Sequence, residues 1–168
     1  MILSTGPDAT GSPEAPIPLP AEYDSWVIWL LRHGDAEDGS DDAARQLTDK
    51  GQRQAEWAGR ALAALGVELD ACLTSPKVRA MDTARVACAE LGVEAEPESA
   101  LEGGGFEIES VAAGRGEVLL VGHEPDFSNA IAAATGARVK LKKGGLAAVE
   151  DGQLHLLLRP ADLKRIRA

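Results

Sequence analysis

Several features are scarce in this chain of 168 residues, and each absence removes a class of protein. The only two cysteines, Cys72 and Cys88, form no CxxC pair, so we interpret both as reduced core residues of a cytoplasmic protein. Three widely spaced histidines add no zinc pattern, so we expect no metal site. No apolar run is long enough to span a bilayer, and no secretion signal is visible.

Positive charge is also scarce. The chain has 17 lysines and arginines against 27 aspartates and glutamates, which gives a formal net charge of −10. A general nucleic-acid-binding protein needs a basic face, so we expect neither nucleic acid nor a membrane as a partner. The length suits a single domain with a true core, and we expect a monomer. An acidic protein that binds phosphate must concentrate its cations locally.

Proline divides the chain near residue 25. Residues 1–24 hold five of the nine prolines, too many for a helix or a paired strand, and we interpret them as a flexible or extended arm. This arm either packs back through Ile17 and Leu19, recruits a partner, or has no function of its own. We expect one folded domain over residues 25–160 and a tail over residues 161–168.

Apolar runs alternate with helical patterns from residue 26 onward, which predicts an α/β fold with a mostly parallel sheet between helices. The uninterrupted apolar run 26–31 predicts a strand covered on both faces. Further strands are expected at 69–73, 93–95 and 117–121, helices at 48–65, 76–91, 106–113 and 125–135, and a hairpin at 146–158. Thr48 is the expected N-cap of the first helix, and Ser75 with Pro76 begins the second.

Cations and imidazoles follow these strands directly. Arg32 and His33 follow the first run and precede Gly34, a residue type used where the backbone turns sharply or approaches a ligand. Arg79 lies in the first turn of the second helix, and His123 follows the strand 117–121. Because the carboxyl ends of parallel strands meet at one edge, we expect an anion site there. Taken singly, Arg79 is also compatible with a solvated helix residue, and His123 with a core histidine.

A series of motifs resembles the histidine phosphatase superfamily, and most of all the small SixA-like phosphohistidine phosphatases. The match covers roughly residues 26–158. The motifs are RHGDA at 32–36, D-x-x-R-x-L-T at 42–48 with Gly51, SPKVRAMDTA at 75–84, LLVGHEPDFS at 119–128 and LKKGGLA at 141–147. The resemblance implies a phosphoglycerate-mutase-like three-layer α/β/α sandwich with no metal or organic cofactor.

The same resemblance implies roles for individual residues. His33 is the expected nucleophile, forming a phosphohistidine intermediate, while Arg32, Arg79, His123 and Gly34 hold the phosphoryl oxygens. Only a neutral imidazole can attack phosphorus, and nearby cations disfavour the protonation of His33. The expected substrate is phosphohistidine in a protein. The alternatives are small phosphate monoesters, or a phosphate-binding module with little turnover.

The sequence does not single out a general acid. Glu102 and Glu124 are the candidates, and ordinary solvated glutamates are the alternative for both. An imidazole leaving group can depart after taking a proton from solvent, whereas an alkoxide needs a general acid worth about 10² to 10⁴ in rate. Lys142 and Lys143 either border the pocket or are surface lysines. We interpret His155 as structural, and the short segment 91–117 predicts an open, shallow site.

Overall fold

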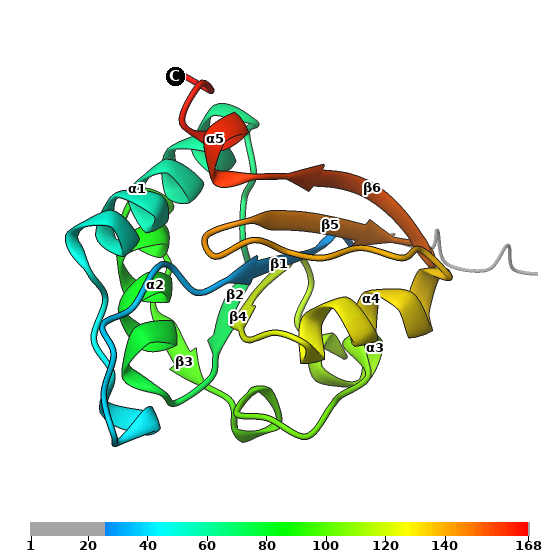
Figure 1. The fold of residues 1–168 in the computed structure, drawn as a ribbon. Coiled ribbons are helices and arrows are strands. Elements are labelled where there is room, and N and C mark those ends of the chain that lie inside the picture. The colour runs from blue at the N-terminus through cyan, green and yellow to red at the C-terminus, as the bar shows by residue number, and fades with distance from the viewer. Residues whose placement is uncertain (1–25, 168) are drawn as a thin grey trace, which may run out of the picture.

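The structure, a computed structural model, describes residues 26–167, so the predicted arm lies outside the described residues. Six strands form one sheet in the order β3-β2-β4-β1-β5-β6 (Figure 1). Their bounds are β1 Ile28–Arg32, β2 Ala71–Thr74, β3 Ala95–Pro97, β4 Val118–Gly122, β5 Leu146–Glu150 and β6 Gln153–Leu158. The first four strands are parallel, and the hairpin β5–β6 joins β1 antiparallel. The predicted α/β class is therefore confirmed.

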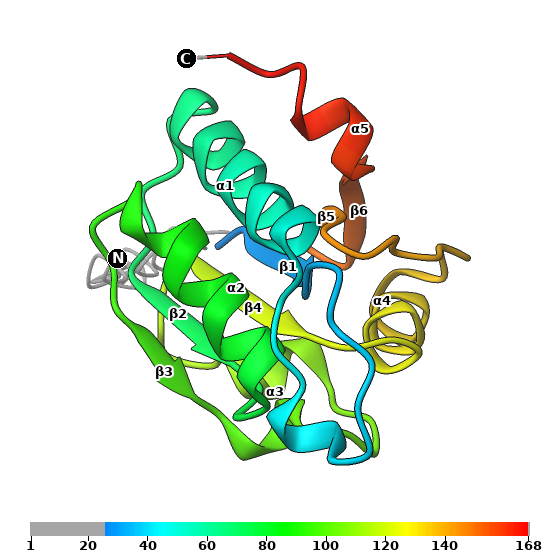
Figure 2. The same cartoon turned by 60° about the vertical axis from the view of Figure 1, so that its left-hand side comes forward.

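Helices cover both faces of this sheet and make three layers (Figures 1 and 2). One face carries α1, α2 and α5, and the other carries α3 and α4. Their bounds are α1 Asp49–Ala64, α2 Val78–Ala89, α3 Ile108–Ala112, α4 Asp126–Thr135 and α5 Pro160–Leu163, with short 3₁₀ turns η1 at Asp42–Ala44 and η2 at Ser99–Leu101.

Strand β1 is buried on both faces, which explains its uninterrupted apolar run. Ile28 and Leu30 pack in the core beneath α3 and α4, whereas Trp29 and Leu31 pack beneath α1 and α2. Successive side chains of a strand point to opposite faces, so a central strand needs apolar residues at every position. The run therefore places the residues that follow it at the carboxyl edge of the sheet.

The predicted N-cap of α1 is confirmed, but that of α2 is wrong. The Thr48 hydroxyl accepts a hydrogen bond from the backbone N–H of Gly51. Helix α2 begins at Val78, and its N-cap is Lys77 rather than Ser75, so Pro76 precedes the helix. The Ser75 hydroxyl is instead bonded to a distant imidazole, a contact that no local pattern reveals.

The C-terminal segment differs from the expected tail, because residues 160–163 form α5. Leu163 is buried in the same core as Trp29, and α5 lies beside α1 (Figure 2). Cys72 and Cys88 are buried and form no disulfide. Within residues 26–167, no helix is long and apolar enough to cross a membrane.

Candidate active site

The pairing of β1 with β4 brings two histidines together at the carboxyl edge of the sheet. Arg32 is in register with Gly122, and the backbone N–H of His33 donates to the Gly122 carbonyl at 3.0 Å. His123 follows Gly122 directly. The rings of His33 and His123 consequently lie with centroids 5.1 Å apart, and each residue is only 6% exposed.

Helix α2 adds a guanidinium to this pair. Arg79 is buried, and its Nε lies 3.4 Å from Nε2 of His33. Arg79 is the second residue of α2, so the end of β2 and the turn before the helix place it at the same edge. The structure therefore brings together His33, Arg79 and His123, which the sequence places 46 and 44 residues apart.

The His33 ring has a defined tautomer. Its Nδ1 lies 2.7 Å from the Gly34 carbonyl, which can only accept, so Nδ1 carries the proton and Nε2 keeps its lone pair. Burial, with the nearby cations Arg79, Arg32 and Lys143, lowers the pKa of His33 from 6.5 to about 4. The expected neutral ring is thus explained by desolvation first and by the cations second.

The His123 ring is held by a serine. Its Nε2 lies 2.7 Å from the Ser75 hydroxyl, and burial, with the neighbouring His33 and Arg79, lowers its pKa to about 3. The hydroxyl of Ser75 also accepts from the backbone N–H of Lys77 at 3.3 Å. Within the described part of the chain, Nδ1 of His123 is buried without a hydrogen-bond partner.

Arg32 lies beside the pair at the end of β1. Its Nη1 donates to the Leu141 carbonyl at 2.8 Å, and its partly buried guanidinium is close enough to His33 to lower the pKa of that ring. Its Nε is buried without a partner among residues 26–167. Burial also lowers the pKa of Arg32, against the opposing effect of the Glu124 carboxylate.

An exposed carboxylate binds the outer side of Arg79. Asp42, in η1, accepts from Arg79 through its backbone carbonyl and lies 3.2 Å from Nη2 through its side chain. Lys77 donates to the same carboxylate at 2.8 Å, and Arg45 is within 3.3 Å. These cations, Lys77 foremost, hold the pKa of Asp42 well below its usual range. Asp42 therefore orients Arg79 from the solvent side.

Gly34, which the resemblance implies as a phosphate contact, has a packing role. Its backbone N–H donates to the Thr83 hydroxyl at 3.0 Å, and Thr83 donates in turn to the Arg79 carbonyl. A Cβ on Gly34 would lie 2.5 Å from the Gly51 carbonyl of α1. The glycine is thus required because two backbone segments touch, and Thr83 ties the loop after His33 to α2.

The two general-acid candidates are placed differently. Glu124 is partly buried, and its Oε1 accepts from the Ser128 hydroxyl at 2.7 Å and from the Leu141 backbone N–H at 3.1 Å. These bonds fix the first turn of α4 to the loop before β5. Glu102 is exposed at the end of η2, and its backbone N–H bonds to the Ser99 carbonyl.

The lysine-rich loop before β5 borders the histidine pair. The backbone N–H of Gly144 lies 3.0 Å from the His33 carbonyl, and Lys143 donates to Asp35 at 3.0 Å. Lys143 also contributes to the lowered pKa of His33, whereas Lys142 is exposed. Of the two expected lysines, Lys143 is therefore the one whose charge acts on the candidate site.

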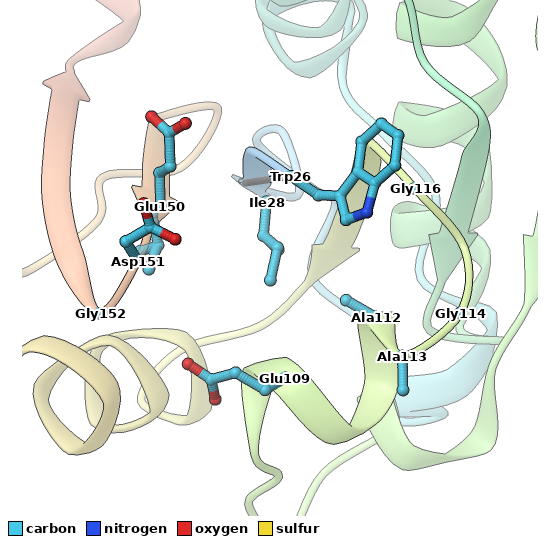
Figure 3. A pocket seen from close by; sticks show the side chains of 11 residues that line it. Trp26, Ile28, Glu109, Ala112, Ala113, Gly114, Gly116, Glu150, Asp151 and Gly152 are labelled. Atoms are coloured by element: carbon cyan, nitrogen blue, oxygen red, sulfur yellow. The ribbon is translucent and has the colours of Figure 1, made fainter. Parts of the chain in front are cut away.

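A separate cavity of about 250 Å³ lies at the opposite end of the strands (Figure 3). Trp26 and Ile28 line it from the start of β1, Glu109 from α3, and Glu150 and Asp151 from the hairpin. His33 follows the other end of β1, so this cavity and the histidine pair lie at opposite edges of the sheet.

Comparisons with known proteins place this arrangement in a family. The profile of the histidine phosphatase superfamily (branch 1) matches residues 28–107. An uncharacterized protein of Picosynechococcus sp. is 35% identical over 144 residues, which cover 77% of this chain and 87% of that protein. The chain belongs to the histidine phosphatase superfamily.

Solved structures share the fold. The protein histidine phosphatase SixA, complexed with tungstate, superposes with a TM-score of 0.71 at 24% identity, covering 82% of this chain and 99% of that one. The putative phosphohistidine phosphatase SixA from Agrobacterium tumefaciens gives 0.69 at 22% identity, covering 80% and 98%. The expected phosphoglycerate-mutase-like sandwich is confirmed.

Proposed function

We propose that this protein is a phosphatase that removes the phosphoryl group from phosphohistidine in a protein substrate, with His33 as the nucleophile. The observation that carries the proposal is the convergence of His33, Arg79 and His123: Nε of Arg79 lies 3.4 Å from Nε2 of His33, and the two imidazole rings are 5.1 Å apart. That nitrogen, Nε2 of His33, is unprotonated and next to a guanidinium. Family membership supports the same chemistry.

Two buried nitrogens without a hydrogen-bond partner in the described part of the chain support the binding of an oxyanion there. Nε of Arg32 and Nδ1 of His123 have no hydrogen-bond partner among residues 26–167, and both belong to residues expected to contact phosphate. Buried polar groups in folded proteins are nearly always satisfied, by protein, by ordered water or by a ligand, so these two nitrogens are free to bind an oxyanion. If the Ser75 hydroxyl donates to Nε2 of His123, the ring proton lies on Nδ1 and can be donated to a phosphoryl oxygen.

The reaction proceeds in two displacements. Nε2 of His33 attacks phosphorus, the bond between phosphorus and the substrate imidazole breaks, and the leaving ring takes a proton from solvent. Water then attacks phosphorus, the bond to Nε2 breaks, and inorganic phosphate leaves. Arg32, Arg79 and His123 stabilise the charge on the transferring oxygens, which is the main requirement of phosphoryl transfer.

The surroundings of the candidate acids favour an imidazole over an alkoxide as leaving group. One oxygen of Glu124, Oε1, accepts hydrogen bonds from Ser128 and Leu141, and Glu102 is exposed after the η2 turn. An alkoxide needs a proton delivered as it leaves, whereas an imidazole is a far better leaving group at neutral pH. Phosphohistidine is thus the preferred substrate, and small phosphate monoesters are the second candidate.

A substrate panel tests this proposal. It contains a phosphorylated phosphotransfer domain, free phosphohistidine and several sugar phosphates, each assayed for phosphate release. We expect the wild type to prefer the phosphorylated protein, His33→Ala to be inactive, and His155→Ala to behave as wild type, since His155 is an exposed residue of β6. Equal activity of His33→Ala, or release from sugar phosphates alone, would contradict the proposal.

A further inference from the structure

A basic groove of about 690 Å³ lies beside the candidate active site. Arg32 at the end of β1, Gln54 and Trp57 of α1, and residues 160–161 of α5 are among its lining. Its other lining residues are Lys50, Lys140, Lys142, Lys143 and Lys164. Among residues 26–167, no aspartate or glutamate lines it, although the whole chain has 27 of them and a net charge of −10.

The basic surface continues along α1 and α5. A second hollow of about 540 Å³ shares Trp57 and Lys164 with the groove and is lined further by Arg60, Ile166 and Arg167. The ammonium of Lys164 lies 5.5 Å from the centre of the Trp57 ring, close enough for a cation–π contact. A ligand larger than a phosphate ion therefore has both charge and an aromatic surface to contact.

Most of these charges are uncompensated. Within the described residues, Lys140, Lys142 and Lys164 form no ion pair with a carboxylate. Lys143 pairs with Asp35, and Lys50, which lies beyond ion-pair distance, still lowers the pKa of the same carboxylate. Elsewhere in the described chain, basic residues such as Arg85 and Arg115 have an acidic partner. Clustered cations repel one another, so the binding of an anionic partner reduces the electrostatic repulsion within the groove.

The groove is connected to the histidine pair through two residues. Arg32 lines the groove and acts on the pKa of His33, and Lys143 does both as well. A polypeptide that presents a phosphorylated side chain to His33 therefore passes its flanking residues over the lysines. Nucleic acid is disfavoured as the occupant, because a long polyanion meets the net negative charge of the rest of the chain.

We propose that this groove docks an acidic segment of the phosphorylated protein substrate, next to the residue that is dephosphorylated. This inference rests on the proposed function, which it deepens by naming the chemistry that selects the substrate. Complementary charges of this kind act mainly on encounter and on discrimination between partners. The groove thus distinguishes acidic protein substrates from neutral ones.

Binding is measured first, without any reaction. The probes are two fluorescein-labelled 15-residue peptides with one central histidine, flanked by glutamates in one and by glutamines in the other. The groove variant is Lys50→Glu/Lys164→Glu. The control is Arg85→Glu/Arg115→Glu, which makes the same change of net charge at exposed positions outside the groove. We expect the wild type and the control to bind the Glu peptide about tenfold tighter than the Gln peptide, and the groove variant to lose this preference.

Turnover is measured with the same peptides phosphorylated on the histidine. We expect the ratio of kcat/KM for the Glu peptide to that for the Gln peptide to fall about tenfold in the groove variant and to stay unchanged in the control. A preference retained by the groove variant, or absent from the wild type, overturns the docking proposal. So does groove-dependent binding of inorganic polyphosphate without binding of the Glu peptide. If the wild type hydrolyses neither peptide, the proposed function fails. The binding measurement with the fluorescein-labelled peptides, read by fluorescence anisotropy, still tests the docking proposal.

Discussion

The hydroxyl of Ser75 lies 2.7 Å from Nε2 of His123, and both residues are buried. This bond links the end of β2 to the end of β4 and fixes the orientation of the ring that faces His33. Ser75 therefore acts as a positioning residue for His123. The same serine would be read locally as the cap of α2, so its role depends on a contact across 48 residues of sequence.

Replacing Ser75 with alanine should lower kcat by about tenfold, because one hydrogen bond to a buried ring is lost. The ¹⁵N chemical shifts of the His123 ring should change as well, since they report the tautomer. Ser110→Ala is the matched control, because Ser110 is an exposed residue bonded to Glu107. Unchanged ¹⁵N chemical shifts of the His123 ring in Ser75→Ala would show that Ser75 does not position this ring.

Replacing Gly34 with alanine should destabilise the fold by about 1–3 kcal/mol, because the new Cβ would lie 2.5 Å from the Gly51 carbonyl and α1 must shift. The measurement is the free energy of unfolding in urea. At the exposed control Gly39→Ala, the nearest heavy atom would be Cγ of Arg45 at 3.4 Å, and little loss is expected. Equal stability of the two variants would mean that the Gly34–Gly51 contact is not required.

Replacing Glu124 with glutamine should leave the hydrolysis of a phosphohistidine peptide within about threefold of the wild type, because no carboxylic acid is needed for an imidazole leaving group. The glutamine keeps a carbonyl oxygen for the bonds from Ser128 and Leu141. Glu102→Gln should behave in the same way. A loss of about 10² or more in kcat for either variant would identify that residue as the general acid.

Acid should destabilise this protein partly through its two paired histidines. Their pKa values in the folded state, about 4 for His33 and about 3 for His123, lie below the ordinary 6.5. As the pH falls below about 6.5, the unfolded chain takes up protons at these rings before the folded protein does. The free energy of unfolding should therefore decrease between pH 7 and pH 4.

Urea denaturation of the wild type and His33→Ala between pH 7 and pH 4 measures this contribution. The free energy of unfolding of the variant should depend less steeply on pH, because one of the two histidines with a lowered pKa is absent. The control Ser110→Ala, which removes no ionisable side chain, should follow the wild-type slope. If the free energy of unfolding of all three proteins changed in parallel with pH, the pKa of His33 would not be lowered in the folded state.

The sequence predicts the framework of the fold because its signals are local. A continuous apolar run marks β1, and the predicted hairpin 146–158 is present as β5 and β6. Its turn is Asp151-Gly152, with both residues at positive φ. Helix α1 begins after its expected cap, Thr48. Leu65, the last residue of the predicted helix 48–65, is 48% exposed, because α1 ends at Ala64 and Leu65 lies beyond its buried face.

The candidate site could be predicted only in part. Arg32 ends β1, His33 and His123 directly follow β1 and β4, and Arg79 lies in the first turn of the helix after β2; the parallel topology brings such positions to one edge. The contacts of Asp42 with Arg79, and of Thr83 with Gly34, join side chains to partners on other segments, and no spacing rule predicts them. The basic groove collects lysines from three separate segments, so only the folded chain reveals it.

The most direct test of the account is to trap the phosphoryl group on the enzyme. A phosphohistidine peptide labelled with ³²P is mixed with the protein, quenched within milliseconds in alkali, and the labelled residue is located by mass spectrometry. We predict acid-labile label on His33 in the wild type and in His155→Ala, and none in His33→Ala. Label on any other residue, or equal labelling of His33→Ala, would contradict the account.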